Sequence, residues 1–193
     1  MKNKLALVHA DLWSKSNVGT IEQRQDLLKQ IFDAKEKSSV ELQESNAGCW
    51  RSRVEYDNLD WLFIELKTMV QIASVHYFDI DEVFKSRVVD KQVKFSYWTN
   101  VNETNASNVL HTHNKDTFAA TYYLQGSNTG TLNFANPANM TLECSKISPM
   151  TRTVAVQPDD GDLFVWPGWV PHEVVPNPSQ RQRVNIAFSI EVS

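Results

Sequence analysis

Hydrophobic positions recur at helical spacing early in the chain. Thr20 and Gln23 have the spacing of a capping box, in which two side chains satisfy backbone N–H groups reciprocally at the start of a helix. The apolar residues that follow fall on one helical face: Ile21, Leu27, Leu28, Ile31 and Phe32. This pattern predicts a helix from about residue 20 that packs its apolar face against the rest of the fold.

A second helix is predicted after Asp57 and Asn58, because both residue types cap helix N-termini well. Its apolar positions repeat every three or four residues, at Leu59, Leu62, Leu66, Met69, Ala73 and Tyr77. Phe63, Val70 and Ile72 widen this face, so we expect the helix to be well buried. His76 lies at its end, and we interpret it as a structural histidine and not as a ligand.

From about residue 88 the apolar period changes from helical spacing to alternation, which is typical of strands. The predicted strands cover residues 93–98, 109–113, 117–124, 131–135, 153–156, 163–166, 172–175 and 183–192, and a short opening strand is predicted within the first dozen residues. The turn at 126–130 predicts a hairpin between its two flanking strands. The Asn-rich segment 100–108 and the segment 136–152 are predicted loops. Short strands separated by turns favour a β-sandwich or barrel covered by the two helices.

Length and composition narrow the class of protein. A chain of 193 residues is the size of a single domain, which we divide into a helical support region (1–90) and a β core (91–193). The net charge of -4 shows no basic excess, so no nucleic-acid surface is evident. No segment has the length of a membrane span. Cys49 and Cys144 form no disulfide framework, which favours a cytoplasmic setting. The oligomeric state is left open.

Three of the five histidines form a pattern that suggests a metal site. His111 and His113 are two residues apart on an extended segment, so their side chains project to the same side. His172 follows an aromatic, turn-rich run, and Arg183 opens the last strand on the same face as Asn185. Imidazole suits iron, zinc, copper and nickel, so the spacing alone names no metal. Taken singly, the histidine pair is equally compatible with a polar loop edge, and for Arg183 alone a structural salt bridge is the slightly favoured interpretation.

These residues lie in motifs that resemble a known family. The motifs are Phe95–Asn100, His111–His113, Ala119–Leu124, Gly130–Pro137, Gly161–His172 and Arg183–Phe188. In this order they resemble the iron(II)/2-oxoglutarate-dependent oxygenases of the bacterial and phage type with a His-x-His motif. The resemblance covers roughly the C-terminal half of the chain. It implies a mainly β fold, a double-stranded β-helix (a jelly-roll, cupin-like barrel) with the metal at its open end and two flanking N-terminal helices.

The resemblance also implies roles for individual residues. His111, His113 and His172 occupy the iron ligand positions, and Arg183 the position that holds the distal carboxylate of 2-oxoglutarate. Tyr123, on the strand face of Thr121, and Asn185 are further candidates for the cosubstrate pocket. Trp98 and Tyr97 are weaker candidates, and ordinary aromatic core is the better interpretation of at least one of them.

One position departs from the wider superfamily, whose metal ligands are two histidines and one carboxylate. Here the second ligand position is His113, so three neutral ligands leave the metal one unit more positive. Asp116 is the nearest carboxylate in the sequence, but on a straight strand it would face away from His113. We therefore expect Asp116 not to be a ligand.

The activity implied by the resemblance is hydroxylation of a substrate by O2, with conversion of 2-oxoglutarate to succinate and CO2. The substrate itself, a small molecule or a peptide, is not predicted. Residues 100–108 and 136–152 are expected to shape the entrance, since loops usually carry specificity. Two alternatives remain at this stage. One is a non-catalytic, cupin-like protein that binds a metal or a carbohydrate, and the other is a three-histidine iron dioxygenase that does not use 2-oxoglutarate.

Overall fold

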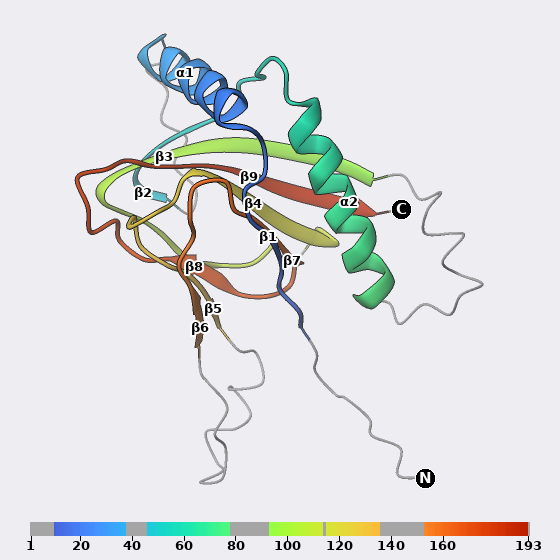
Figure 1. Ribbon diagram of the computed structural model, residues 1–193. Coiled ribbons are helices and arrows are strands. Elements are labelled where there is room, and N and C mark those ends of the chain that lie inside the picture. Colours follow the sequence, from blue (N-terminus) through green and yellow to red (C-terminus); the bar gives the residue numbers. More distant parts are fainter. Residues whose placement is uncertain (1–9, 38–45, 78–92, 114, 136–152, 193) are drawn as a thin grey trace, which may run out of the picture.

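The structure is a computed structural model that describes residues 10–37, 46–77, 93–113, 115–135 and 153–192 (Figure 1). Within these residues the chain forms two helices and nine strands, in the order β1 (Trp13–Lys15), α1 (Ile21–Lys37), β2 (Asn46–Ser52), α2 (Asp60–Tyr77), β3 (Val93–His111), β4 (Phe118–Gln125), β5 (Leu132–Ala135), β6 (Thr153–Val156), β7 (Leu163–Pro167), β8 (His172–Val174) and β9 (Arg183–Val192). The predicted opening strand and the predicted loop 136–152 lie mostly or wholly outside the described residues.

Both predicted helices form. The capping box at the start of α1 is confirmed: the Thr20 N–H donates to Oε1 of Gln23 (2.8 Å), and the Gln23 N–H donates to Oγ1 of Thr20 (3.2 Å). The apolar faces were predicted too wide, because Ile21 is 60% exposed in α1 and Ile72 is 49% exposed in α2. Each helix packs on one side only, so apolar residues at the margin of its face stay in solvent. No helix in the described residues is long and apolar enough to cross a membrane.

The strands form one curled sheet in the order β1-β7-β4-β9-β3-β8-β5-β6, with β2 paired to β3 off this path. Strand β3 belongs to both halves of the sheet. Its first ten residues pair with β9, and its last residues pair with β8. Figure 1 shows how the long, bent β3 leads from the larger group of strands to the smaller group β8, β5 and β6. The bend brings the end of β3 over the interior face of the sheet.

The loop predicted at residues 100–108 is wrong, because these residues are part of β3. Asparagine favours turns, but here β2 and β9 pair with residues 100–102 from both sides, and β2 pairs again with Ser107 and Asn108. Asn105 takes a positive φ of 66°, which asparagine tolerates better than most residues. The turn-forming residue therefore bends the strand without ending it, and this segment forms sheet wall in place of an entrance loop.

The hairpin predicted across Gly126–Gly130 is also wrong. Strand β4 pairs with β7 and β9, whereas β5 pairs with β6 and β8. The turn thus carries the chain from one half of the sheet to the other. A turn signal predicts reversal of the chain, but it does not determine which strands pair afterwards.

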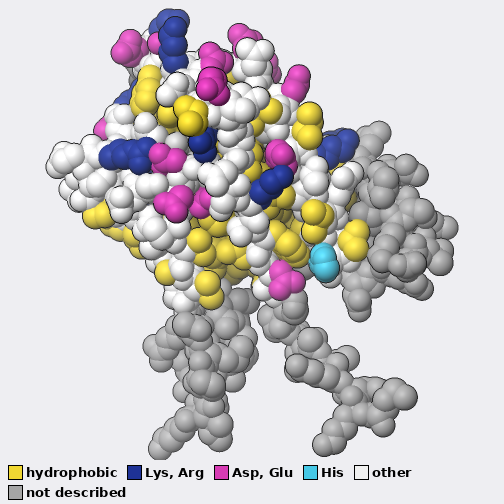
Figure 2. Space-filling model, in the orientation of Figure 1, with side chains coloured by type: hydrophobic (Ala, Val, Ile, Leu, Met, Phe, Trp, Pro, Cys, Tyr) yellow, Lys and Arg dark blue, Asp and Glu magenta, His cyan; other side chains and the backbone are white. Residues whose placement is uncertain are grey.

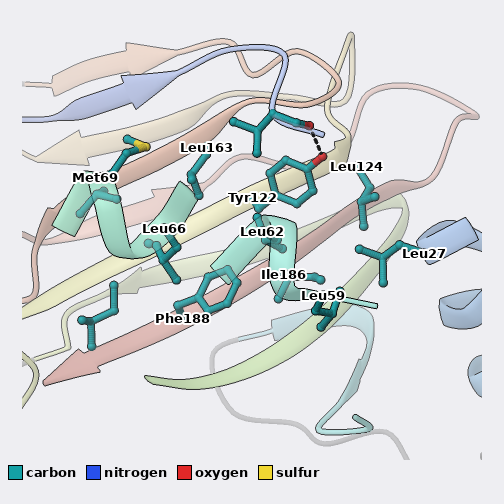
Figure 3. Close-up of a cluster of buried hydrophobic side chains, with 14 of the residues drawn as sticks. Leu27, Leu59, Leu62, Leu66, Met69, Tyr122, Leu124, Leu163, Ile186 and Phe188 are labelled. Carbon is teal, nitrogen blue, oxygen red and sulfur yellow. Dashed lines mark hydrogen bonds between the residues drawn. The ribbon is translucent and has the colours of Figure 1, made fainter. Parts of the chain in front are cut away.

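The main hydrophobic core lies between α1, α2 and the outer face of the larger half of the sheet. Figure 3 shows the leucines of α2 packed against Tyr122, Ile186 and Phe188, and the hydroxyl of Tyr122 donating to the carbonyl of Val18 (2.7 Å). A second cluster fills the interior face, with Ala119, Tyr123, Leu132, Phe134, Phe164, Trp166 and Val170 buried. The helices cover only the outer face, and a cavity forms on the interior face beside this second cluster.

The helix-covered surface carries charges of both signs. Figure 2 shows Lys and Arg side chains interspersed with Asp and Glu, with no continuous basic region among the described residues of this face. Mixed charge of this kind is typical of a surface exposed to solvent. The predicted lack of a nucleic-acid surface remains a prediction.

Candidate active site with a three-histidine cluster

The end of β3 and the start of β8 bring the three predicted histidines together. His111 and His172 are direct cross-strand partners, although they are 61 positions apart in the sequence. His113 follows two residues after His111, just beyond the end of β3, and its backbone N–H donates to the carbonyl of Gly168 (2.7 Å). The pairing of β3 with β8 therefore assembles the cluster.

One ligand nitrogen from each of His111, His113 and His172 lies within 4.8 Å of the other two. The ring centroids are 4.3 Å apart for His111 and His172, 5.2 Å for His113 and His172, and 5.4 Å for His111 and His113. No carboxylate or thiol among the described residues joins this group. Three imidazoles this close present their nitrogens to a common point, as a bound metal requires.

Hydrogen bonds at Nδ1 hold all three rings. His111 Nδ1 lies 2.7 Å from the carbonyl oxygen of Val109, and His172 Nδ1 lies 3.0 Å from that of Val170. A carbonyl only accepts, so each Nδ1 carries the proton and each Nε2 keeps its lone pair. His113 Nδ1 contacts Ser189 Oγ (3.2 Å) and the carboxylate of Asp116 (3.4 Å). This second-sphere arrangement is typical of metal-binding histidines.

The environment keeps the imidazoles neutral. Burial, together with the neighbouring His111 and His113, lowers the pKa of His172 to about 3, against the hydrogen bond to Val170. Burial also lowers the pKa values of His111 and His113, and the positive charge of Arg51 acts in the same direction on both. Metal ligation requires the neutral form, so the rings need lose no proton at neutral pH in order to bind a metal.

Asp116 lies beside the cluster but is not part of it. The sequence predicted that its side chain would face away from His113 on a straight strand. The chain instead turns at His113, whose carbonyl accepts a hydrogen bond from the Asp116 N–H (2.9 Å). The turn returns the Asp116 carboxylate to the ring of His113, where it supports a candidate ligand from outside the ligand group.

A cavity with an empty volume of about 440 Å³ opens beside the histidines on the interior face. Tyr123 and Asn185, two of the predicted cosubstrate residues, line it together with Thr121, whose hydroxyl accepts a hydrogen bond from the Asn185 amide (2.9 Å). Burial raises the pKa of Tyr123 to about 12, so its phenol stays protonated and can donate. Trp166 also lines the cavity, and its buried indole N–H has no acceptor among the described residues. These groups offer polar contacts to a small ligand in a largely apolar space.

Arg183 lies one step further along the same face of β9 and is 1% exposed. Its guanidinium donates to the backbone carbonyls of Thr129 (2.7 Å), Val175 (3.1 Å) and Ala106 (3.3 Å). Within the described chain it forms no ion pair with a carboxylate, so the salt bridge considered from the sequence is not found there. A guanidinium has five N–H groups, so these three bonds leave Nε–H and one Nη2–H, the donors of a side-on carboxylate contact.

The two aromatic candidates lie on opposite sides of the sheet. Tyr97 packs against Phe63 and Phe188 on the helix side of the sheet, as core aromatics do. Trp98 lines the cavity and stacks on His113, with centroids 5.8 Å apart and an interplanar angle of 14°. The guanidinium carbon of Arg51 also lies over the Trp98 ring, 4.5 Å from its centroid. Sequence reasoning missed Arg51, because no local pattern shows that β2 would pair beside β3.

Known proteins resemble this chain in sequence and in structure. A sequence model of the family described as "Putative 2OG-Fe(II) oxygenase" matches residues 96–189, the segment that contains all three clustered histidines and Arg183. Over this segment the chain is similar to the 2OG-Fe(II) oxygenase family. Iron(II) and 2-oxoglutarate, the cofactor and cosubstrate expected from the sequence, are those of the family. No curated protein sequence matches the chain.

Several solved structures share the fold of this chain at low sequence identity. A prolyl-4-hydroxylase from Pseudomonas putida is 16% identical, with a TM-score of 0.62 over 93% of this chain and 91% of that one. A Trichoplax adhaerens prolyl hydroxylase, solved with a hypoxia inducible factor peptide fragment, is 13% identical (TM-score 0.63; 93% and 83% covered). HygX from Streptomyces hygroscopicus, solved with nickel and 2-oxoglutarate, is 10% identical (TM-score 0.55; 93% and 82% covered). The predicted fold class, a mainly β double-stranded β-helix with two helices, is confirmed.

Proposed function

We propose that this protein is an iron(II)- and 2-oxoglutarate-dependent dioxygenase that hydroxylates its substrate. In the overall reaction, substrate C–H, O2 and 2-oxoglutarate yield substrate C–OH, succinate and CO2. The observation that carries the proposal is the convergence of His111, His113 and His172, each held through Nδ1. Three such nitrogens fit iron(II) and leave further coordination positions for other ligands.

His111, His113 and His172 would hold the iron, which when bound supplies the activation of O2. Arg183 would hold the distal carboxylate of 2-oxoglutarate through its two remaining N–H groups. Tyr123 and Asn185 would orient the cosubstrate in the cavity, and the buried Trp166 N–H is a further donor on the same wall. The apolar walls around these groups would limit the access of water to the reacting atoms.

The test is an anaerobic titration of the metal-free protein with iron(II) and 2-oxoglutarate, followed by visible absorption. We expect a weak charge-transfer band that needs both components and is lost in His172→Ala. The matched control is His76→Ala, because His76 is an exposed histidine at the end of α2. Iron binding without the band would favour a three-histidine dioxygenase or a metal-binding protein that does not use 2-oxoglutarate. A band that survives His172→Ala would contradict the proposed ligand set.

A further inference from the structure

A second cavity adjoins the histidine cluster on the side away from Arg183. It has an empty volume of about 610 Å³ and is lined by Arg51, Arg53, Ser96, Trp98, His111, Thr112, His113 and Ser189. We call it the outer cavity, and the cavity lined by Tyr123 and Asn185 the inner cavity. Trp98, His111 and His113 line both cavities, so the two meet at the cluster.

The sheet register explains this order. Along the interior face of β9, Arg183 comes first, then Asn185, Ala187 and Ser189. Asn185 and Ala187 line the inner cavity, whereas Ser189 lines the outer one. A molecule bound between Arg183 and the histidines would therefore leave the outer cavity free for a second molecule. Both cavities have access to the same metal position.

Two arginines line the outer cavity, one near the end of β2 and one just after that strand. Arg51 pairs with Asn100 across β2 and β3, and Asn100 pairs with Asn185 across β3 and β9, so the three residues share one row of the sheet. Arg53 follows two positions later and is exposed. Arg51 is 4% exposed and lies against the ring of Trp98, so water screens its charge weakly. The lining includes two cations, and among the described residues that form it there is no acidic side chain.

The charge balance of the site favours an anionic second ligand. The three imidazoles are neutral, so the two positive charges of iron(II) would be balanced by a 2-oxoglutarate dianion and, behind His113, by the Asp116 carboxylate. Arg51 and Arg53 then add two further positive charges at the opening of the site. A guanidinium presents paired donors that match the oxygens of a carboxylate or a phosphate.

We propose that the outer cavity is the substrate subsite and that Arg51 and Arg53 bind a carboxylate or phosphate group of the substrate. This inference deepens the proposed function and rests on it. The anionic group anchors the substrate on the arginine side, and a C–H bond further along the molecule faces the metal position between His111 and His113. Trp98 positions Arg51 through the contact of the guanidinium with its ring.

The first experiment titrates inorganic phosphate and, separately, acetate into the zinc protein saturated with 2-oxoglutarate, followed by 1H–15N NMR. Zinc binding and 2-oxoglutarate binding are measured beforehand in the same sample. We expect saturable shifts of the Trp98 indole N–H and of the Arg51 and Arg53 Nε–H signals. The anion that binds more tightly, phosphate or acetate, identifies the preferred group.

The variants are Arg53→Gln and Arg51→Gln, each expected to weaken anion binding at least tenfold. Arg53 is exposed, so Arg53→Gln tests the subsite without disturbing the core. The control is Lys67→Gln, which removes one positive charge from an exposed position on α2, on the other side of the sheet, and should change anion binding less than twofold. Absence of saturable shifts at these signals, or equal anion affinity in the arginine variants, overturns the proposal.

The outcomes separate this proposal from the proposed function. Zinc and 2-oxoglutarate binding without anion binding overturns the subsite alone. Anion binding in a protein that binds no zinc overturns the assignment of the cavity to a substrate and the proposed function together. In the iron protein, matched pairs of compounds that differ only in a free carboxylate or phosphate against its neutral ester are compared for stimulated succinate release. Equal stimulation by both members of every active pair also overturns the proposal.

Discussion

The carboxylate of Asp116 lies 3.4 Å from Nδ1 of His113, and a tight backbone turn connects the two residues. This contact places a negative charge directly behind one of three neutral candidate ligands. In a family with two histidines and one carboxylate as ligands, the negative charge lies on a residue that binds the metal directly. In this chain the carboxylate contacts a candidate histidine ligand and not the metal position. It partly replaces the negative charge that is lost because position 113 is a histidine.

Asp116→Asn should therefore weaken metal binding while keeping the shape of the side chain. Partners of this kind contribute roughly 10–100-fold to metal affinity, so we expect a loss of at least tenfold for zinc, measured by competition with a chelating dye. Asp33→Asn, an exposed position in α1, is the control. Equal zinc affinity in the two variants would show that the Asp116 charge does not act on the metal.

Gly168→Ala should disturb the same turn by steric conflict. A Cβ at position 168 would lie 2.4 Å from the carbonyl oxygen of Asp116 and 2.8 Å from that of His113, and both are backbone atoms. We expect a loss of about 1–3 kcal/mol in the free energy of unfolding, the range for overpacking, together with weaker zinc binding. Urea unfolding and the dye competition measure the two effects.

The comparison for Gly168→Ala is Gly48→Ala. Gly48 has a φ of 68° but space for a Cβ, whose nearest neighbour atom would lie 3.7 Å away. Its substitution should cost stability through backbone strain and leave zinc affinity unchanged. Wild-type zinc affinity in Gly168→Ala would contradict the proposed dependence of His113 on this turn.

Arg183→Lys should weaken 2-oxoglutarate binding selectively. Lysine keeps the positive charge but loses the planar pair of donors, so the KM for 2-oxoglutarate should rise at least tenfold. Zinc affinity should stay the same, because Arg183 contacts no histidine of the cluster and instead donates to three backbone carbonyls. A turnover that depends on a substrate but not on 2-oxoglutarate, in wild type and variant alike, would instead support the dioxygenase that does not use 2-oxoglutarate.

The metal-free protein should lose stability as the pH falls from about 6.5 to about 3. Burial lowers the pKa of His172 in the folded state to about 3, whereas the unfolded chain has an ordinary value near 6.5. Between these values the unfolded state binds a proton that the folded state excludes, so protonation favours unfolding. The contribution of His172 has a slope of up to about 1.4 kcal/mol per pH unit.

Urea unfolding at several pH values measures this slope. His172→Gln removes the titrating group, so the free energy of unfolding of the variant should depend less on pH across the same range. Carboxylates elsewhere titrate in both proteins, and the difference between the two slopes isolates the histidine. Identical slopes would show that the buried His172 is not the group that titrates.

Local sequence determined the elements of this protein and the chemistry of its candidate site. The capping box predicted the start of α1, and alternation predicted the strands that carry His111, His172 and Arg183. These signals depend on residues a few positions apart, so the chain shows them without its fold. The spacing of His111 and His113 likewise placed two imidazoles on one side before any pairing was known.

Only the tertiary structure decided which strands pair and which side chains meet. It kept residues 100–108 in β3, separated β4 from β5, and turned Asp116 back toward His113. It also brought Arg51 to a cluster whose first histidine is 60 positions away. The physical reason is that a strand selects its neighbours by burial of a whole sheet face and by backbone hydrogen bonding, to which distant parts of the chain contribute together.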